Sequence, residues 1–334
     1  MSRSRARHRS FLVWTCLGAA ALAAALGAPL QASDHSDAPV TATGARPDAN
    51  ITDLHAFVVG PNLVLSLATN QAIPPSATSY LFPTDITFDF NIDVDSEVDP
   101  DDPEGNGGTI LDPQRIQEDV TFRVRFEADG SARLQRIGGN HGAIERRPIS
   151  RAVRSVAVDS DPAGPVTFAA RDTERRRGND PGVVGFFTGL RDDPFIRGPR
   201  QGRNSGAIVI EVPLSSILRE QSTILIWATS KIEDADGPFQ ELTGRSLKSM
   251  FPENDALNGL HPRHHLSQAG ISPDVIIFDT ARPAAYPNGR VLEDDVVDLV
   301  GDPRVLGNDA PFPSTNDRSF TSTFPYLATP HPAP

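Results

Sequence analysis

Cysteine is almost absent from this 334-residue sequence. The only one, Cys16, lies inside an apolar run near the N-terminus. A mature chain that has lost this run holds no cysteine, which excludes disulfides, a thiolate nucleophile, cysteine-ligated metals and covalent haem attachment. Stability must then come from a hydrophobic core or from bound ions. The remaining chain of about 300 residues is long enough to bury a substantial core.

The common catalytic signatures are also missing. The sequence has no G-x-S-x-G elbow, no phosphate-binding P-loop and no G-x-G-x-x-G after a predicted strand. Serine and histidine are present, but no spacing pairs them. The sequence therefore indicates no activity by motif, and leaves open whether the protein is an enzyme.

Positive charge is scarce. Lys231 and Lys248 are the only lysines, and the formal net charge of −12 becomes −16 when the four arginines of the first 32 residues are removed. Such a chain is a poor non-specific binder of nucleic acid and attracts cations. We therefore expect no nucleic-acid partner; a cell-surface or small-molecule ligand is compatible with the composition.

Residues 1–32 have the pattern of a secretory signal peptide. Four arginines precede the apolar run Phe11–Ala28, and Leu30-Gln31-Ala32 offers a small residue at the cleavage edge. The alternative is a retained anchor, but the run is short and rich in alanine for a bilayer core of about 30 Å. We predict an exported protein, periplasmic or extracellular, with no transmembrane segment after signal removal.

The rest of the chain, residues 33–334, is predicted to be a single domain: mainly β, an antiparallel β-sandwich-like fold with long loops and a few short helices. Thirty prolines and 26 glycines favour turns, and Ile86–Val94 alternates apolar and polar residues with the period of a strand. Arg151–Asn179 looks less regular. The other expected strands are 54–69 (a hairpin about Gly60-Pro61-Asn62), 120–126, 133–137, 206–212 and 222–230, and a short apolar run occupies 274–279. The expected helical segments are 213–220, 242–250 and 292–300.

The first candidate metal site lies in Ser33–Phe57, where His35, Asp37, Asp48 and Asp53 occur together. His35 and Asp37 are two residues apart, so they face the same side of an extended segment. Sets of histidine and carboxylate suit zinc, iron or manganese, whereas carboxylate and carbonyl sets suit calcium. The alternative is that these side chains cap turns.

The second candidate is the acidic loop Asp93–Glu104, in which Asp93 and Asp95 form the D-x-D start found in many calcium loops. The loop lacks the glycine of an EF-hand at its sixth position, which is Val98, and Pro100 interrupts it. The alternative is a solvated acidic loop.

Two further groups hold residues of the ligand type. His261, His264 and His265 could bind a transition metal or haem, although a surface loop is the alternative. Asp294 and Asp295 follow Arg290 and could equally form a salt-bridged helix end. Asp192, which follows the segment 183–190, would belong to a site if it met His35, Asp53 or Asp295 in space.

Several stretches together resemble a bacterial secreted family known as domain of unknown function 4331. They are SDHSDAP, DANITDLHAF, EDVTFRVRF, FFTGLRDDPF with AIVIEVP, YPNGRVLEDDVVDLV and FPYLATPH, in this order between residues 33 and 331. The family pattern S-H-R-E-A-P becomes Asp34-His35-Ser36-Asp37-Ala38-Pro39 here, and residues 231–265 depart from the family. The resemblance implies an exported single domain and a docked mature N-terminus, and it implies no activity.

Two functions are compatible with these observations. The preferred one is an exported binding or structural module that holds a divalent cation, with calcium favoured and zinc or iron as alternatives. The other is a metal-dependent hydrolase or oxidoreductase, with His35, Asp37, Asp53 and His331 around the ion.

Overall fold

The computed structural model describes residues 46–70, 73–74, 76–100, 107–138, 151–157, 182–194, 202–245, 252–296, 299 and 315–332. All of them belong to one compact unit, Ala32–Pro334. The candidate ligands His35 and Asp37 lie outside the described residues.

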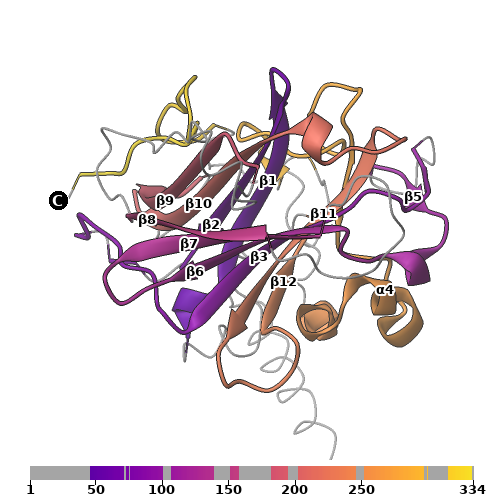
Figure 1. The fold of residues 1–334 in the computed structure, drawn as a ribbon, viewed down its shortest axis with the longest axis horizontal. Helices are drawn as coiled ribbons and strands as arrows, with labels where there is room; N and C mark the ends of the chain where they lie inside the picture. Colours follow the sequence, from indigo (N-terminus) through magenta and orange to yellow (C-terminus); the bar gives the residue numbers. More distant parts are fainter. Residues whose placement is uncertain are drawn as a thin grey trace, which may run out of the picture. The chain divides into compact units, whose positions relative to one another are not determined.

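The first sheet, sheet A, has four antiparallel strands in the order β1-β2-β10-β9 (Figure 1). They are β1 (Ile51–Val59), β2 (Asn62–Thr69), β9 (Gly185–Asp192) and β10 (Asn204–Pro213). The hairpin between β1 and β2 is confirmed, and Gly60 takes the positive φ of 58° that its turn requires. The register shifts between Ile51 and Asp53, which is a β-bulge at Thr52.

The second sheet, sheet B, has the order β12-β11-β3-β6-β7-β8, and β13 also pairs with β11. Within this sheet, β3, β6, β7 and β8 follow one another both along the chain and as hydrogen-bonded neighbours. The strands are β3 (Ile86–Asp93), β6 (Val120–Phe126), β7 (Ser131–Gly138), β8 (Arg151–Ala157), β11 (Thr223–Ile232), β12 (Glu241–Thr243) and β13 (Ile276–Asp279).

The core lies between the two sheets, which makes the fold the expected mainly-β, sandwich-like one. The alternating apolar residues of β3 confirm their prediction, because Phe88 and Phe90 are fully buried there. They meet the inward-facing Leu65 and Ile208 of sheet A. Packing the two apolar faces together removes their surface from water, which stabilises the fold by about 25 cal/mol for each Å² of apolar surface buried.

The helical predictions are largely wrong within the described residues. Residues 213–220 hold only the single 3₁₀ turn η4 (Leu214–Ser216), and residues 242–243 of the expected turn region belong to β12, which pairs with β11. Of the expected helix 292–300, residues 292–295 are not helical, whereas the described residues 296 and 299 are. The carboxylate of Asp294 accepts the backbone N–H groups of Tyr286 and Val291, which favours a turn over a helix.

Short elements complete the described chain. The interpretation of residues 151–179 as irregular is wrong for 151–157, which form β8. No helix among the described residues is long and apolar enough to cross a bilayer. The short elements are η1 (Pro47–Ala49), β4 (Val98–Asp99), β5 (Thr109–Ile110), η2 (Pro113–Arg115), η5 (Pro252–Gly259), α4 (Pro262–His264) and the π-helical η6 (His265–Ala269).

The outer face of sheet A is covered by the C-terminal segment 315–332, drawn in yellow beside β9 and β10 (Figure 1). Its Phe324 and Leu327 belong to a second apolar group, which we call the outer cluster. The outer cluster consists of Phe57, Val64, Phe187, Ala207, Val209, Leu292, Phe324 and Leu327. The sandwich therefore has apolar contacts on both faces of sheet A.

Candidate metal centre

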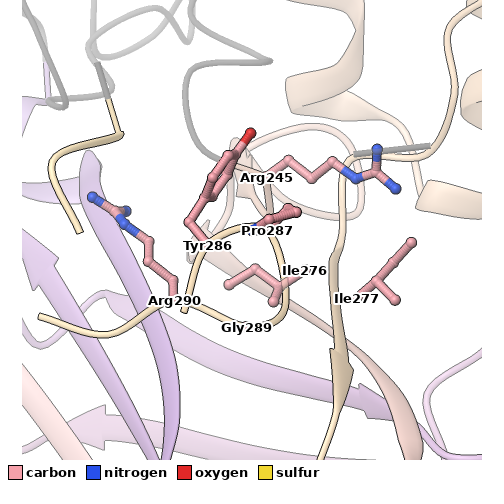
Figure 2. A pocket seen from close by; sticks show the side chains of 7 residues that line it. All are labelled: Arg245, Ile276, Ile277, Tyr286, Pro287, Gly289 and Arg290. Carbon is pink, nitrogen blue, oxygen red and sulfur yellow. The ribbon is translucent and has the colours of Figure 1, made fainter. Parts of the chain in front are cut away.

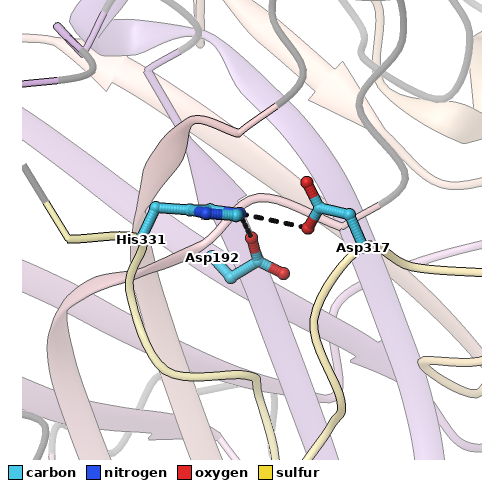
Figure 3. Close-up of side chains that lie close together, drawn as sticks. All are labelled: Asp192, Asp317 and His331. Carbon is cyan, nitrogen blue, oxygen red and sulfur yellow. Dashed lines mark hydrogen bonds and ion pairs between the residues drawn. The ribbon is translucent and has the colours of Figure 1, made fainter. Parts of the chain in front are cut away.

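Asp192, Asp317 and His331 converge at the end of sheet A (Figure 3). His331 Nε2 lies 2.9 Å from Asp192 Oδ1 and 3.1 Å from Asp317 Oδ1. Only the contact with Asp317 has hydrogen-bond geometry. Asp192 Oδ1 is thus a buried carboxylate oxygen that accepts no hydrogen bond and faces two other ligand-type side chains.

The ends of two strands position these groups. Asp192 is the last residue of β9 and pairs with Asn204, the first residue of β10. The Asn204 side chain then holds His331 at both backbone polar groups, since His331 N–H donates to Asn204 Oδ1 (2.7 Å) and Asn204 Nδ2 donates to the His331 carbonyl (3.2 Å). Asn204 is buried, so this anchor is a fixed part of the fold.

The neighbouring Asn316 orients the Asp192 carboxylate. Asn316 Nδ2 donates to Asp192 Oδ2 at 2.6 Å and to the carbonyl of Arg318 at 2.9 Å. This contact uses one oxygen of Asp192 and leaves the other turned towards His331 and Asp317. Such outer-shell hydrogen bonds commonly fix the ligands of metal centres.

The electrostatics favour a cation at this point. Burial above all, with the charge of Asp317, raises the pKa of Asp192 to about 8, against the opposing effects of the Asn316 hydrogen bond and the Arg318 charge. Asp192 is 1% exposed, whereas His331 and Asp317 are 19% and 26% exposed at their side chains. A buried carboxylate beside a second carboxylate therefore holds a proton where a metal ion could replace it.

The donor set indicates which ions fit. One imidazole nitrogen and two carboxylate oxygens suit Zn²⁺, Mn²⁺ or Fe²⁺, whose ligand distances are about 2.0–2.2 Å. Such distances place neighbouring ligands about 3 Å apart, close to the separations observed here. Calcium, which prefers an all-oxygen shell of six to eight ligands, fits this set less well.

A second acidic group consists of Asp93, Asp95 and Asp119. Asp93 is occupied as a turn cap, since its carboxylate accepts the N–H groups of Ser96 and Gln117. A cation is already present: Arg219 lies 3.2 Å from Asp119 Oδ1 and 3.8 Å from Asp95 Oδ2. Arginine thus supplies the compensating charge that a calcium ion would supply.

The remaining predicted ligands lie apart from these groups. Asp48 forms an ion pair with Arg46, and the buried Asp53 pairs with Arg290 at 2.6 Å. The Asp294 carboxylate caps backbone N–H groups, and the Asp295 carbonyl accepts the N–H of Leu299. Among the residues that the structure describes, none of these four belongs to a group that could hold a metal.

The histidines at 261–265 do not form a triad of ligands. His261 contacts Glu118 at 2.9 Å, and His265 is fully buried, where it contacts the carbonyl of Leu260 and accepts the N–H of Asp274. The expectation of a surface loop is therefore wrong for His265, which connects two segments of the core.

A pocket lies between Tyr286, Pro287, Gly289 and the stems of Arg245 and Arg290 (Figure 2). The two guanidinium groups point to opposite sides of it in Figure 2. Arg290 is occupied by Asp53 and Arg245 donates to the carbonyl of Val275. Since the polar ends turn outwards, the pocket offers no convergent polar groups to a ligand.

Asp317 is the member of the metal centre that sequence reasoning missed, whereas Asp192 and His331 are among the predicted ligands. Asp317 lies in a proline- and asparagine-rich tail far along the chain from Asp192, so no spacing connects them. Within this tail, the ligand-type residues Asn316 and Asp317 precede His331, and this is the local pattern that could have indicated a site.

Comparison with known proteins gives no relative: no family model, no curated protein and no solved structure matches the chain. The resemblance to domain of unknown function 4331 accordingly stays a prediction.

Proposed function

We propose that this is an exported protein that binds one divalent transition-metal ion through Asp192, Asp317 and His331. The observation that carries the proposal is the convergence of His331 Nε2 with two carboxylate oxygens, one of them buried and without a hydrogen bond. The signal-like N-terminus and the resemblance to a secreted family support export. An ion at this position would also add stability to a chain that lacks disulfides.

Metal analysis and titration of the mature protein test this proposal. We expect one Zn²⁺, Mn²⁺ or Fe²⁺ per chain, and a melting temperature that falls by roughly 5 °C when a chelator removes an ion present at about 100 times its Kd. Asp317→Asn, which removes one ligand charge at a partly exposed position, should lower the affinity at least about tenfold.

Asp95→Asn is the matched control, because Asp95 belongs to the acidic group that Arg219 already neutralises. It should bind the ion as the wild type does. No bound metal in either protein would refute the proposal, and binding of calcium alone, lost in Asp95→Asn, would place the site at the other acidic group.

Metal-dependent hydrolysis or oxidation is a second candidate function. Three protein ligands leave further coordination positions for water or substrate, as in catalytic zinc sites. The partial exposure of His331 and Asp317 favours such access. Assays of the metal-loaded protein against ester, phosphoester and reducing substrates test it, with the Asp317→Asn variant as the blank.

A further inference from the structure

We propose that the metal ion acts as a clamp that closes the C-terminal segment over sheet A, and that removal of the ion lets this segment detach locally. The inference rests on the proposed metal site. A bound ion need not hold the segment in place, so the clamp is a separate claim from the metal site.

The ligands are divided between two parts of the chain. Asp192 belongs to β9, whereas Asp317 and His331 both belong to the segment 315–332. An ion that uses all three would tie the segment to the sheet and would close the 14-residue span between its own two ligands. Closing such a loop removes conformational entropy from the detached state.

The segment is held by side-chain contacts and not by a strand ladder, since no helix or strand is assigned to residues 315–332. Its anchors include the Asn204–His331 backbone contacts, the hydrogen bond from Asn316 to Asp192, that from the Tyr326 hydroxyl to Glu211 (3.3 Å), and Phe324 with Leu327 in the outer cluster. Irregular peripheral segments of this kind open at a lower free energy than the core strands.

One of these anchors lies at the far end of β9 from the metal centre. The Phe324 ring packs on Gly185, where a Cβ atom would come within 2.8 Å of it. Gly185 is the first residue of β9 and Asp192 the last, so the two positions are about 20 Å apart along the strand. Docking of Phe324 and binding of the ion are thus separate events on one segment.

Linkage couples these two events. An ion that binds only when the segment is docked stabilises the docked state, and its apparent affinity falls in proportion to the fraction of chains that are docked without it. A detached segment would uncover the sheet residues of the outer cluster, including Phe57, Val64 and Phe187.

Trypsin cleavage after Arg318 measures detachment directly. Arg318 lies in the segment, and its Nη2 donates to Thr329 Oγ1 at 2.8 Å in the docked state. We expect the metal-loaded full chain to be cut between residues 318 and 319 at least about tenfold more slowly than the chelated chain, as followed by mass spectrometry of this bond. A short arginine peptide of unrelated sequence controls for effects of metal or chelator on the protease.

Two variants decide between the clamp and the site alone. Asp317→Asn should be cut at the fast rate with or without metal, whereas Asp95→Asn should be protected as the wild type is. Gly185→Ala keeps all three ligands but obstructs Phe324, so it should speed cleavage without metal and lower the apparent metal affinity in proportion to the loss of docked chains. Gly259→Ala, where a Cβ meets nothing within 4 Å, should change neither.

The outcomes separate the two proposals. Metal that binds in titration but leaves the cleavage rate and the Gly185→Ala affinity unchanged overturns the clamp and leaves the metal site intact. Absence of binding in titration overturns both. Protection in the wild type and Asp95→Asn only, with the reduced affinity of Gly185→Ala, supports the clamp.

Discussion

At the scale of single residues, Asp53 and Arg290 form the most deeply buried ion pair described here. Their side chains are 0% and 2% exposed, and Arg290 Nη2 lies 2.6 Å from Asp53 Oδ1. Removing one partner of such a pair leaves a buried charge without compensation. Asp53 therefore serves the fold in the described structure, and its carboxylate neutralises arginine.

Asp53→Asn is expected to destabilise the protein by about 3–5 kcal/mol, as other broken buried pairs do. Urea unfolding monitored by tryptophan fluorescence measures the loss. Arg282→Ala, which breaks a pair with Asp279 at a half-exposed position, is the matched control and should cost about 1 kcal/mol or less. Equal losses in the two variants would contradict this account of the buried pair.

The raised pKa of Asp192 gives a pH dependence with a definite sign. Burial keeps this carboxyl protonated in the metal-free fold up to a pKa of about 8, whereas the unfolded chain releases the proton near pH 4. The native state thus binds more protons than the unfolded state between these pH values. The contribution of Asp192 to stability is full below pH 4 and is lost as the pH rises towards 8.

Asp192→Asn should remove this pH dependence, because the amide resembles the protonated carboxyl. In the metal-free protein, the free energy of unfolding of the variant relative to the wild type should rise between pH 4 and 8 and level off above 8. Denaturant titrations at several pH values measure it. A difference that stays constant with pH would show that the Asp192 pKa is not raised.

Burial has the opposite effect on the pKa of His55, because the charged form of histidine is a cation. Desolvation lowers its pKa well below the usual value, and the positive charge of Arg290 lowers it further. Neither ring nitrogen has a hydrogen-bond partner in the described part of the chain. This histidine is therefore neutral at physiological pH.

At the scale of elements, β3 shows how far alternation alone can determine a structure. Every second residue from Ile86 to Ile92 is buried in the core, while Thr87 faces the other side. The period of two is fixed by the pleat, so a short strand with one apolar face can be identified locally.

Phe90→Ala should therefore cost about 3–5 kcal/mol of stability, through lost transfer free energy and the cavity that remains. Thr87→Ala on the same strand is the control and should change stability by about 0.5 kcal/mol. The comparison uses the denaturant midpoint of each variant. Similar losses in both would mean that β3 does not present Phe90 to the core.

The segment at β12 shows where local reading fails. The sequence predicts a helical turn from Leu242 onwards, yet Leu242 and Thr243 belong to β12, which pairs with residues 228–230 of β11. An unpaired sheet edge offers hydrogen bonds that outweigh a weak local preference. The predicted helix at 213–220 shrinks to one turn because β10 continues through Pro213, so that the strand occupies its first residue.

At the scale of the whole molecule, the hydrophobic core of the sandwich stabilises the described chain, which contains no disulfide. The core extends over both sheets, and the outer cluster adds a second apolar layer on sheet A. The candidate metal site lies where the segment 315–332 meets this sheet, so its residues come from both parts of the fold. This is why we expect the ion to affect the stability of the tail more than that of the core.

The sequence by itself determined the mainly-β class, the hairpin at Gly60 and the strand β3, because these depend on alternation and turn residues that are close together in the chain. It also marked Asp192 and His331 as possible ligands from their residue types. The tertiary structure alone decided that Asp317 joins them and that Asp53, Asp93 and Asp294 are occupied by arginine or backbone N–H groups. The physical reason is that a site depends on distances between distant segments and on which charges are already neutralised, and neither is encoded in local spacing.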